Sequence, residues 1–175
     1  LYMPGANARA LEKAKTLDAD ALILDLEDSV APDAKQAARE GVCAAVGSGE
    51  YGRKELTIRV NGLDTPWFAD DVTAAAQAGP GGIVGPRVSS VADVHAIEAA
   101  LEKAGAPGYS FLWAMGETPV AMLHCEEIAA ASERLAVLVM GTNDLAKELR
   151  AEHVPGRQPL LTGLGLGERF ADFLA

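Results

Sequence analysis

The chain has 175 residues, a length that fits one domain, and 49% of them are hydrophobic, enough to bury a core. Its formal net charge of -10 argues against binding DNA or RNA by phosphate neutralisation. Its apolar runs are too short to span a membrane, no signal peptide is visible, and two separated cysteines, Cys43 and Cys125, indicate reduced thiols and a cytoplasmic setting.

Because Leu1 is an unusual first residue, the N-terminus of the protein is expected upstream of it. Short apolar runs alternate with amphipathic segments along the chain. The expected strands span residues 1–3, 21–26, 56–60, 82–88, 110–115 and 135–140. The expected helices span residues 6–17, 34–46, 67–78, 91–104, 120–131 and 145–151. Strand–helix alternation at this spacing predicts βαβ units and a parallel sheet.

Polar residues gather just after the strand ends. They are Glu27, Asp28, Asn61, Arg87, Glu117 and Asp144. No GxGxxG follows the first strand, which disfavours a dinucleotide-binding sheet. In a β/α barrel the carboxyl ends of all strands open on one face, and catalytic residues come from several of them. The fold class predicted is therefore α/β, a TIM-type β/α barrel.

A complete barrel has eight strand–helix units and about 250 residues, whereas about six units are visible. We therefore expect one β/α-barrel domain over residues 1–175, truncated or incompletely covered at its C-terminal end. An open layer completed by a partner is the alternative. Residues 159–175 are expected to form helix or loop.

Glu117 and Asp144 each follow an apolar strand, and the two strands are consecutive. Consecutive strands of a parallel sheet tend to be neighbours, so these carboxylates are expected to meet. Two carboxylates plus waters suit Mg²⁺, which prefers octahedral oxygen coordination. The alternative is that each carboxylate caps the helix that follows it. We favour the metal site because Arg59 is expected on the same face.

Arg59 lies inside an apolar strand, where a guanidinium needs an anion. Its planar fork suits a carboxylate or an enolate of the substrate. An ion pair with Asp25 or Glu27 is the alternative, and both can hold. Strand alternation places Asp25 and Glu27 on one side, where Asp28 adds a third acid, so a role in supporting the metal waters and Arg59 is expected.

Other candidate binding residues have weaker signals. Arg87 follows Pro86 at a strand end and faces either the pocket or the surface. The turn through Tyr2, Pro4 and Gly5 leads into a helix whose N-terminal amides could hold a phosphate. A plain turn is the alternative.

These segments together resemble the citrate lyase beta subunit family, within the HpcH/HpaI aldolase group of acyl-CoA lyases. The matching stretches, in the family's order, are LYMPGAN, ADALILDLEDSVAPDAK, IRVNGLDTPW, GGIVGPRV, LWAMGETPVAMLHCEEIA and LAVLVMGTNDLAKEL. The resemblance implies a β/α barrel, Glu117 and Asp144 as magnesium ligands, and Arg59 as the substrate-binding arginine. It also implies Glu27 and Asp28 as supporting acids.

The function expected is a Mg²⁺-dependent lyase, with Mn²⁺ as an alternative ion, acting on a citryl-, malyl- or citramalyl-CoA type thioester. The thioester is the substrate, not a resident cofactor. Glu27 or a carboxylate from a neighbouring subunit is the candidate base. The resemblance further implies a homo-oligomer, trimer or hexamer, and other citrate lyase subunits as partners.

Three alternatives stay open at this point. The first is a malyl-CoA-type thioester hydrolase on the same site. The second is an impaired binding or remnant subunit, an interpretation prompted by Gly85 and Gly116 where bulky aliphatic residues are expected. The third is a phosphoenolpyruvate-type lyase on a related barrel, which would need no CoA site.

Overall fold

A computed structural model of the chain describes residues 1–151, so the tail expected as helix or loop over 159–175 lies outside the described residues. The described part contains one six-stranded, all-parallel sheet in the order β1-β2-β3-β4-β5-β6. The strands are β1 (Tyr2–Pro4), β2 (Ala21–Asp25), β3 (Glu55–Arg59), β4 (Gly82–Gly85), β5 (Phe111–Gly116) and β6 (Leu135–Met140). All six predicted strands are thus confirmed, in sequential order.

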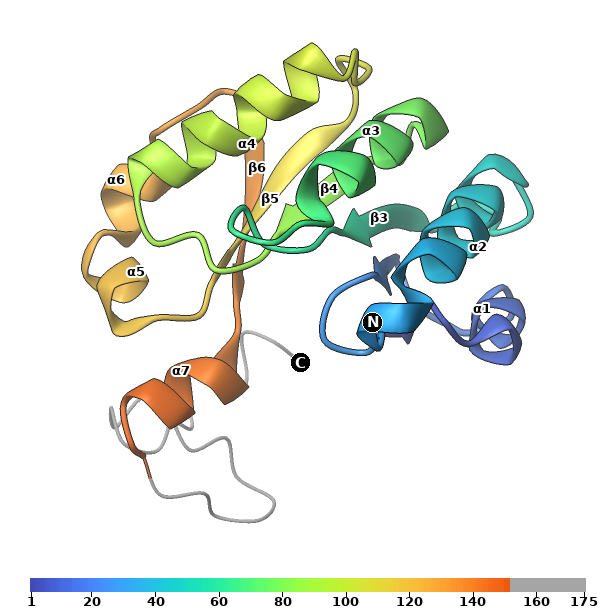
Figure 1. The fold of residues 1–175 in the computed structure, drawn as a ribbon, viewed down its shortest axis with the longest axis horizontal. Helices are drawn as coiled ribbons and strands as arrows, with labels where there is room; N and C mark the ends of the chain where they lie inside the picture. Colours follow the sequence, from blue (N-terminus) through green and yellow to red (C-terminus); the bar gives the residue numbers. More distant parts are fainter. Residues whose placement is uncertain (152–175) are drawn as a thin grey trace.

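Helices connect the strands. They are α1 (Ala8–Ala14), the 3-10 turn η1 (Pro32–Ala34), α2 (Lys35–Gly47), α3 (Phe68–Ala78), α4 (Val91–Lys103), α5 (Pro119–Leu123), α6 (Cys125–Ala129) and α7 (Thr142–Glu148). Neighbouring helices pack in chain order along the outside of the sheet, α2 on α3 and α3 on α4 (Figure 1). Sequential parallel strands with helices on one face are the arrangement of a β/α barrel.

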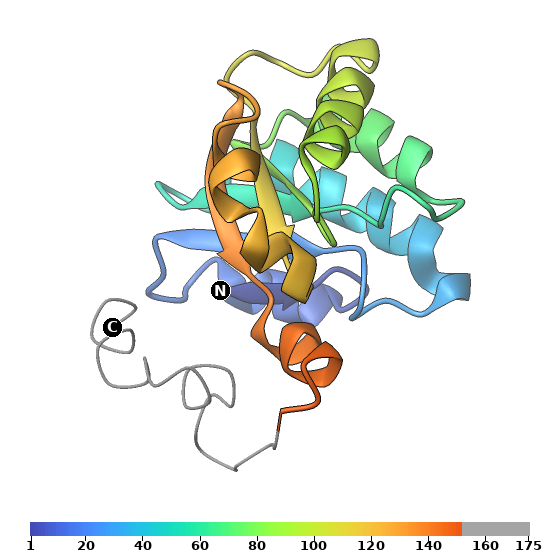
Figure 2. The ribbon, with the colours of Figure 1, turned by 90° about the vertical axis from the view of Figure 1, so that its left-hand side faces the viewer.

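The two faces of the sheet carry different clusters. The larger core lies under the helices and includes Leu24, Ile58 and Leu112, all fully buried. The opposite face carries a small cluster of Ile23, Val84 and Met115, with Trp113 and Val139 packed beside it. In a β/α barrel this second face is the interior. Within residues 1–151 the sheet is not closed, and β1 and β6 form its two edges (Figure 2).

Parallel register brings the strand ends together. Pro4 is paired with Asp25, Asp25 with Arg59, and Arg59 with Val84. The β5–β6 ladder continues past its last pair, because the amide of Gly141 donates to the carbonyl of Gly116 at 2.9 Å. The segments after β2, β3, β5 and β6 therefore all start at the carboxyl-terminal end of the sheet, which is called the rim below.

Four predicted elements differ from the structure by three residues or more. The helix expected over 6–17 is α1 (Ala8–Ala14), and the helix expected over 145–151 is α7 (Thr142–Glu148), which includes Asp144. The expected helix over 120–131 is two short helices that share His124, whose backbone (φ -109°, ψ 15°) leaves the helical region. The expected strand over 82–88 ends at Gly85. Pro86 has no amide to donate to the ladder, and Arg87 adopts a positive φ of 55°.

Gly85 and Gly116 do not leave holes in the barrel wall. A methyl group at Gly85 would lie 2.5 Å from Ile97 Cδ1, and one at Gly116 would lie 2.9 Å from Met122 Cε. Side chains of the helices, Ile97 and Met122, already fill the space that bulky aliphatic residues were expected to occupy.

No helix within residues 1–151 is both long and apolar enough to cross a membrane.

Gly5 is required by close packing of the first turn. Its amide donates to Asp25 O at 2.9 Å, and an added Cβ would overlap that carbonyl and lie 2.8 Å from Val42 Cγ2. We predict that Gly5→Ala lowers the free energy of unfolding by about 1–3 kcal/mol through overpacking. Gly47→Ala is the matched control, because nothing lies within 4 Å of its Cβ position. Denaturant unfolding of both variants checks this, and equal stability of the two would contradict it.

Candidate active site

A buried ion pair joins the ends of β2 and β3. Arg59 Nε lies 2.7 Å from Asp25 Oδ1, and Nη2 donates to Asp25 Oδ2 at 2.9 Å, a bidentate pairing. Both residues are almost fully buried. Burial opposes ionisation of Asp25, but its hydrogen bonds with Arg59 outweigh this and hold the pKa of the carboxyl below its usual value. The sequence left open whether Arg59 forms an ion pair within the protein, binds the substrate, or does both. The structure contains the ion pair, and the substrate-binding role stays a prediction.

Glu27 occupies the remaining side of the guanidinium. Its Oε2 lies 3.0 Å from Arg59 Nη1, and Asp28 Oδ2 lies 3.6 Å from the same nitrogen. Glu27 Oε2 is buried, yet it has no well-aligned hydrogen-bond partner in the part of the chain described. Burial raises the pKa of Glu27 to about 7; Arg59 opposes the rise, while Asp28 and Glu117 add to it. A carboxyl that titrates near neutrality suits proton transfer.

The Arg59 head group has two further neighbours. Tyr2 lies with its ring centroid 5.2 Å away, a cation–π contact. Met115, on the inner face of β5, lies with its sulfur 3.8 Å from Nη1. The guanidinium is thus held between β1 and β5 as well as by the acids.

Glu117 follows β5 and is buried, with 4% of its surface exposed. Its Oε1 accepts a hydrogen bond of 2.9 Å from the amide of Arg87, the residue with positive φ. Burial raises the pKa of the Glu117 carboxyl, and the charge of Asp144 adds to the rise although the Arg87 amide opposes it. Thr118, rather than Glu117, caps α5, so the capping alternative does not hold for Glu117.

Asp144 lies in the first turn of α7. Its Oδ1 is 2.9 Å from Lys147 Nζ, and this hydrogen bond holds the pKa of the carboxyl below its usual value. Gly141 lets the side chain of Glu117 lie close to the start of α7, because a Cβ at this glycine would be 2.7 Å from Glu117 Oε2.

The carboxylate pair fits a hard divalent cation. Within residues 1–151 no group of three or more His, Cys, Asp or Glu side chains could hold a metal. Mg²⁺ often takes only one or two carboxylates and fills its shell with waters and substrate oxygens. The charge of Asp144 raises the pKa of the Glu117 carboxyl, and a bound cation would offset that effect. The metal assignment of the two residues stays a prediction.

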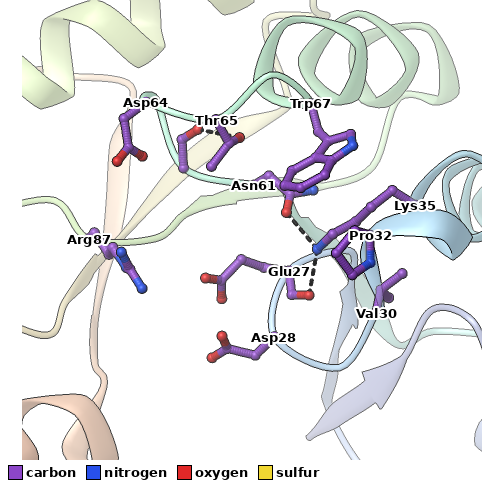
Figure 3. A pocket seen from close by; sticks show the side chains of 11 residues that line it. Glu27, Asp28, Val30, Pro32, Lys35, Asn61, Asp64, Thr65, Trp67 and Arg87 are labelled. Carbon is purple, nitrogen blue, oxygen red and sulfur yellow. Dashed lines mark hydrogen bonds between the residues drawn. The ribbon is translucent and has the colours of Figure 1, made fainter.

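Two cavities lie along the rim, where the strands end and the residues described above are placed. One of about 430 Å³ is lined by Tyr2, Asp25, Arg59, Met115 and Asp144, among others. The second, of about 300 Å³, is lined by Asp28, Lys35, Trp67 and Arg87 among others (Figure 3). Asp28 lines both cavities. These volumes suit small-molecule ligands.

The predicted binding residues of the first turn occupy different positions. Tyr2 lines the larger cavity, but the amide of Gly5 is already bonded to Asp25 O. The amide of Ala10 is capped by the Asn7 side chain. The structure thus gives Gly5 a packing role, and Pro4 pairs with β2 at the strand end. Their substrate-binding role stays a prediction.

Sequence reasoning missed two buried charges behind the rim, Lys35 and Asp71. Lys35 is 6% exposed and Asp71 is fully buried. The available signal was periodicity: Lys35 shares a helical face with buried Ala38 and Val42, and Asp71 precedes buried Val72 on the inner face of its helix.

Known proteins resemble this chain over most of its length. The model of the family HpcH/HpaI aldolase/citrate lyase matches residues 1–168. A (3S)-malyl-CoA thioesterase of Cereibacter sphaeroides is 49% identical over 166 residues, covering 95% of this chain and 56% of the relative. An L-malyl-CoA/beta-methylmalyl-CoA lyase of the same species is 40% identical over 156 residues, covering 85% and 49%.

Solved structures give the same result. The citrate lyase beta subunit of M. tuberculosis complexed with oxaloacetate and magnesium superimposes with a TM-score of 0.68 at 28% identity. The match covers 87% of this chain and 61% of that one. The chain therefore spans roughly half to three-fifths of the length of these relatives.

The pKa of Glu27 predicts a pH-dependent penalty. Folding raises this pKa from 4.5 to about 7, so ionisation of Glu27 lowers stability progressively as the pH rises through that window. We predict that Glu27→Gln matches the parent chain near pH 5 and exceeds its free energy of unfolding near pH 8 by about 1–3 kcal/mol. Denaturant unfolding at both pH values measures it.

Glu102→Gln on the exposed side of α4 is the control and should change stability little at either pH. A Glu27→Gln variant that is less stable than the parent near pH 8 would show that the Arg59 contact outweighs burial.

Proposed function

The chain belongs to the HpcH/HpaI aldolase/citrate lyase family, and from this premise we propose that it acts as a Mg²⁺-dependent carbon–carbon lyase. Its substrate would be a 3-hydroxy-acyl thioester of citryl-, malyl- or citramalyl-CoA type, and its products an acetyl thioester and an oxo acid. The observation that carries the proposal is the Arg59 guanidinium, held by Asp25 and Glu27 beside the Glu117–Asp144 pair.

The acid–base step falls to Glu27. At neutral pH a carboxyl with a pKa of about 7 is partly ionised, so it can accept the proton of the substrate hydroxyl and later return one. Loss of that proton breaks the adjacent carbon–carbon bond and leaves the electron pair on the acetyl thioester as its enolate. Return of a proton to that carbon completes the acetyl thioester. A carboxylate from a neighbouring subunit is the alternative base.

Arg59 would stabilise the negative charge of the enolate oxygen. Asp25 accepts hydrogen bonds from both Nε and Nη2, so the guanidinium is fixed in orientation before substrate binds. Nη1 is the nitrogen that faces Glu27 and Asp28, where the reacting atoms would lie. Asp28 would assist by balancing this charge.

Glu117 and Asp144 would hold the Mg²⁺ ion, or Mn²⁺ in its place. When bound, the ion supplies Lewis-acid polarisation of the substrate's oxygens. The M. tuberculosis citrate lyase beta subunit complexed with oxaloacetate and magnesium supports magnesium as the ion. Arg87 and Tyr2, each lining one of the two cavities, are the candidate contacts for the thioester carrier or the acyl group.

A thioester hydrolase on the same site is the second candidate. It is favoured by the 49% identity to a (3S)-malyl-CoA thioesterase. Glu27 would then activate water instead of a substrate hydroxyl. Assembly as a homo-oligomer (a trimer or hexamer), association with other citrate lyase subunits, and a cytoplasmic location complete the proposal. The free Cys43 and Cys125 of the described residues fit a reducing compartment.

Product analysis separates the reactions. Mass spectrometry of mixtures with citryl-, malyl- and citramalyl-CoA, with and without Mg²⁺, should show acetyl-CoA plus an oxo acid from one of them, only with Mg²⁺. Free CoA plus the hydroxy acid would instead establish the hydrolase. Unchanged substrate, with no Mg²⁺ binding by calorimetry, would identify a remnant.

The metal assignment has its own test. We predict that Asp144→Asn weakens Mg²⁺ binding by at least about tenfold, because a neutral amide replaces an anionic ligand. Asp18→Asn serves as control, since Asp18 is exposed and precedes β2, at the amino-terminal end of the strands. Titration calorimetry measures both, and equal Mg²⁺ affinity of the two variants would overturn the assignment.

A further inference from the structure

A buried lysine lies directly behind the rim. Lys35 begins α2, and its Nζ donates to Leu26 O at 2.8 Å. It also donates to Glu27 O and to Asn61 Oδ1, each at 2.7 Å (Figure 3). The ring of Trp67 covers the ammonium at 5.2 Å. Three protons meet three oxygens, so the hydrogen-bonding capacity of the ammonium is used up by the protein itself.

The contacts continue away from the rim. Asn61 Nδ2 donates to Leu26 O at 3.1 Å and to Asp71 Oδ2 at 2.6 Å. Asp71 Oδ1 accepts from Arg39 Nε at 2.7 Å. Lys35, Asn61, Asp71 and Arg39 therefore form one polar chain that ties α2 and α3 to the segments after β2 and β3.

The turn that carries Glu27 is held from two sides. Asp25 accepts hydrogen bonds from the amides of Glu27 at 2.9 Å and Ser29 at 3.0 Å. Lys35 binds the carbonyls of Leu26 and Glu27. Removing the ammonium would take one of two donors from each carbonyl, leaving Leu26 O with Asn61 Nδ2 and Glu27 O with the amide of Val30. It would also remove the Lys35 donor from Asn61 Oδ1, so the turn would lose its side-chain tie to α2.

We propose that Lys35 is a positioning residue, whose ammonium sets the turn that aims Glu27 at Arg59 without touching the substrate. The inference rests on the proposed function for its catalytic consequence, but its structural part is independent of it. Lys35 holds main-chain atoms of the turn, and the turn holds the acid 3.0 Å from the guanidinium.

The test uses the whole 175-residue chain with Lys35→Met and its matched control Lys54→Met. Lys54 also donates to a main-chain carbonyl, Lys15 O at 3.0 Å. It directly precedes β3 and therefore lies at the amino-terminal end of the strands, away from the rim. Lys35→Met is expected to lower kcat by about 10–100-fold, as loss of supporting contacts does elsewhere. KM should change by less than about threefold, because substrate contacts remain. Lys54→Met should keep the parental kcat.

Chemical rescue provides a readout that a merely structural role would not move. Lys35 lines the 300 Å³ cavity, so a truncated side chain leaves a space open to small cations. Ethylammonium is expected to restore kcat of Lys35→Ala several-fold and to leave Lys54→Ala unaffected. Absence of rescue together with a parental kcat in Lys35→Met would overturn the inference. If Lys35→Met does not fold, Lys35→Arg takes its place, because a planar guanidinium cannot meet the same three oxygens.

Hydrogen exchange keeps the inference separate from the proposed function. The amides of Glu27, Ser29 and Val30 are all hydrogen-bonded within the turn. They should exchange at least about tenfold faster in Lys35→Met, while amides of β4 keep their protection. A parent chain that cleaves no thioester would refute the proposed function, and the exchange rates would still decide the role of Lys35. Unchanged exchange at these three amides would overturn it.

Discussion

The Arg59–Asp25 ion pair is the constraint on which the rim depends. A guanidinium inside a sheet is tolerated only when an anion balances its charge, and Asp25 does so while accepting two of its N–H groups. Parallel register makes this possible, since Asp25 and Arg59 are directly paired residues of β2 and β3. With the Nε–Nη2 edge of the guanidinium occupied by Asp25, Nη1 is the nitrogen that faces Glu27 and Asp28. The unusual pKa of Glu27 follows from burial in this crowded anionic setting, which a single arginine does not neutralise.

Much of the fold could be predicted because buried parallel strands appear as continuous apolar runs, and each was found within a few residues of its observed ends. Prediction failed where local backbone chemistry decides. Pro86 ended β4 earlier than hydrophobicity suggested, and His124 divides a segment whose apolar spacing looks like one helix. Periodicity reports which face is buried, not where a backbone leaves the helical region.

Residues of the site could be predicted where they follow the carboxyl-terminal ends of parallel strands, because these ends lie on one side of the sheet. Glu27, Glu117 and Asp144 were found from that rule, and Arg59 was found because a charged side chain inside an apolar strand needs a buried anion. The contacts of Lys35, Asn61 and Asp71 were not, because they join positions 8 to 35 residues apart through a geometry that no spacing encodes. Lys35 and Asp71 looked like ordinary charges on amphipathic helices, although both are placed on the buried side. A charged residue within the apolar stripe of a helix was the signal available, and it indicates a buried partner.

The two candidate reactions need nearly the same charged groups. Each needs a cation near Glu117 and Asp144, a positive charge at Arg59 and a carboxyl of near-neutral pKa at Glu27. They differ in what loses a proton to Glu27: a substrate hydroxyl for carbon–carbon cleavage, or water for thioester hydrolysis. Water access is therefore the property that separates them, rather than the set of acids. In residues 1–151 the larger cavity is bordered by Tyr2 and Met140, which are 43% and 40% exposed. A cover over these two side chains would favour cleavage, and an opening there would favour hydrolysis.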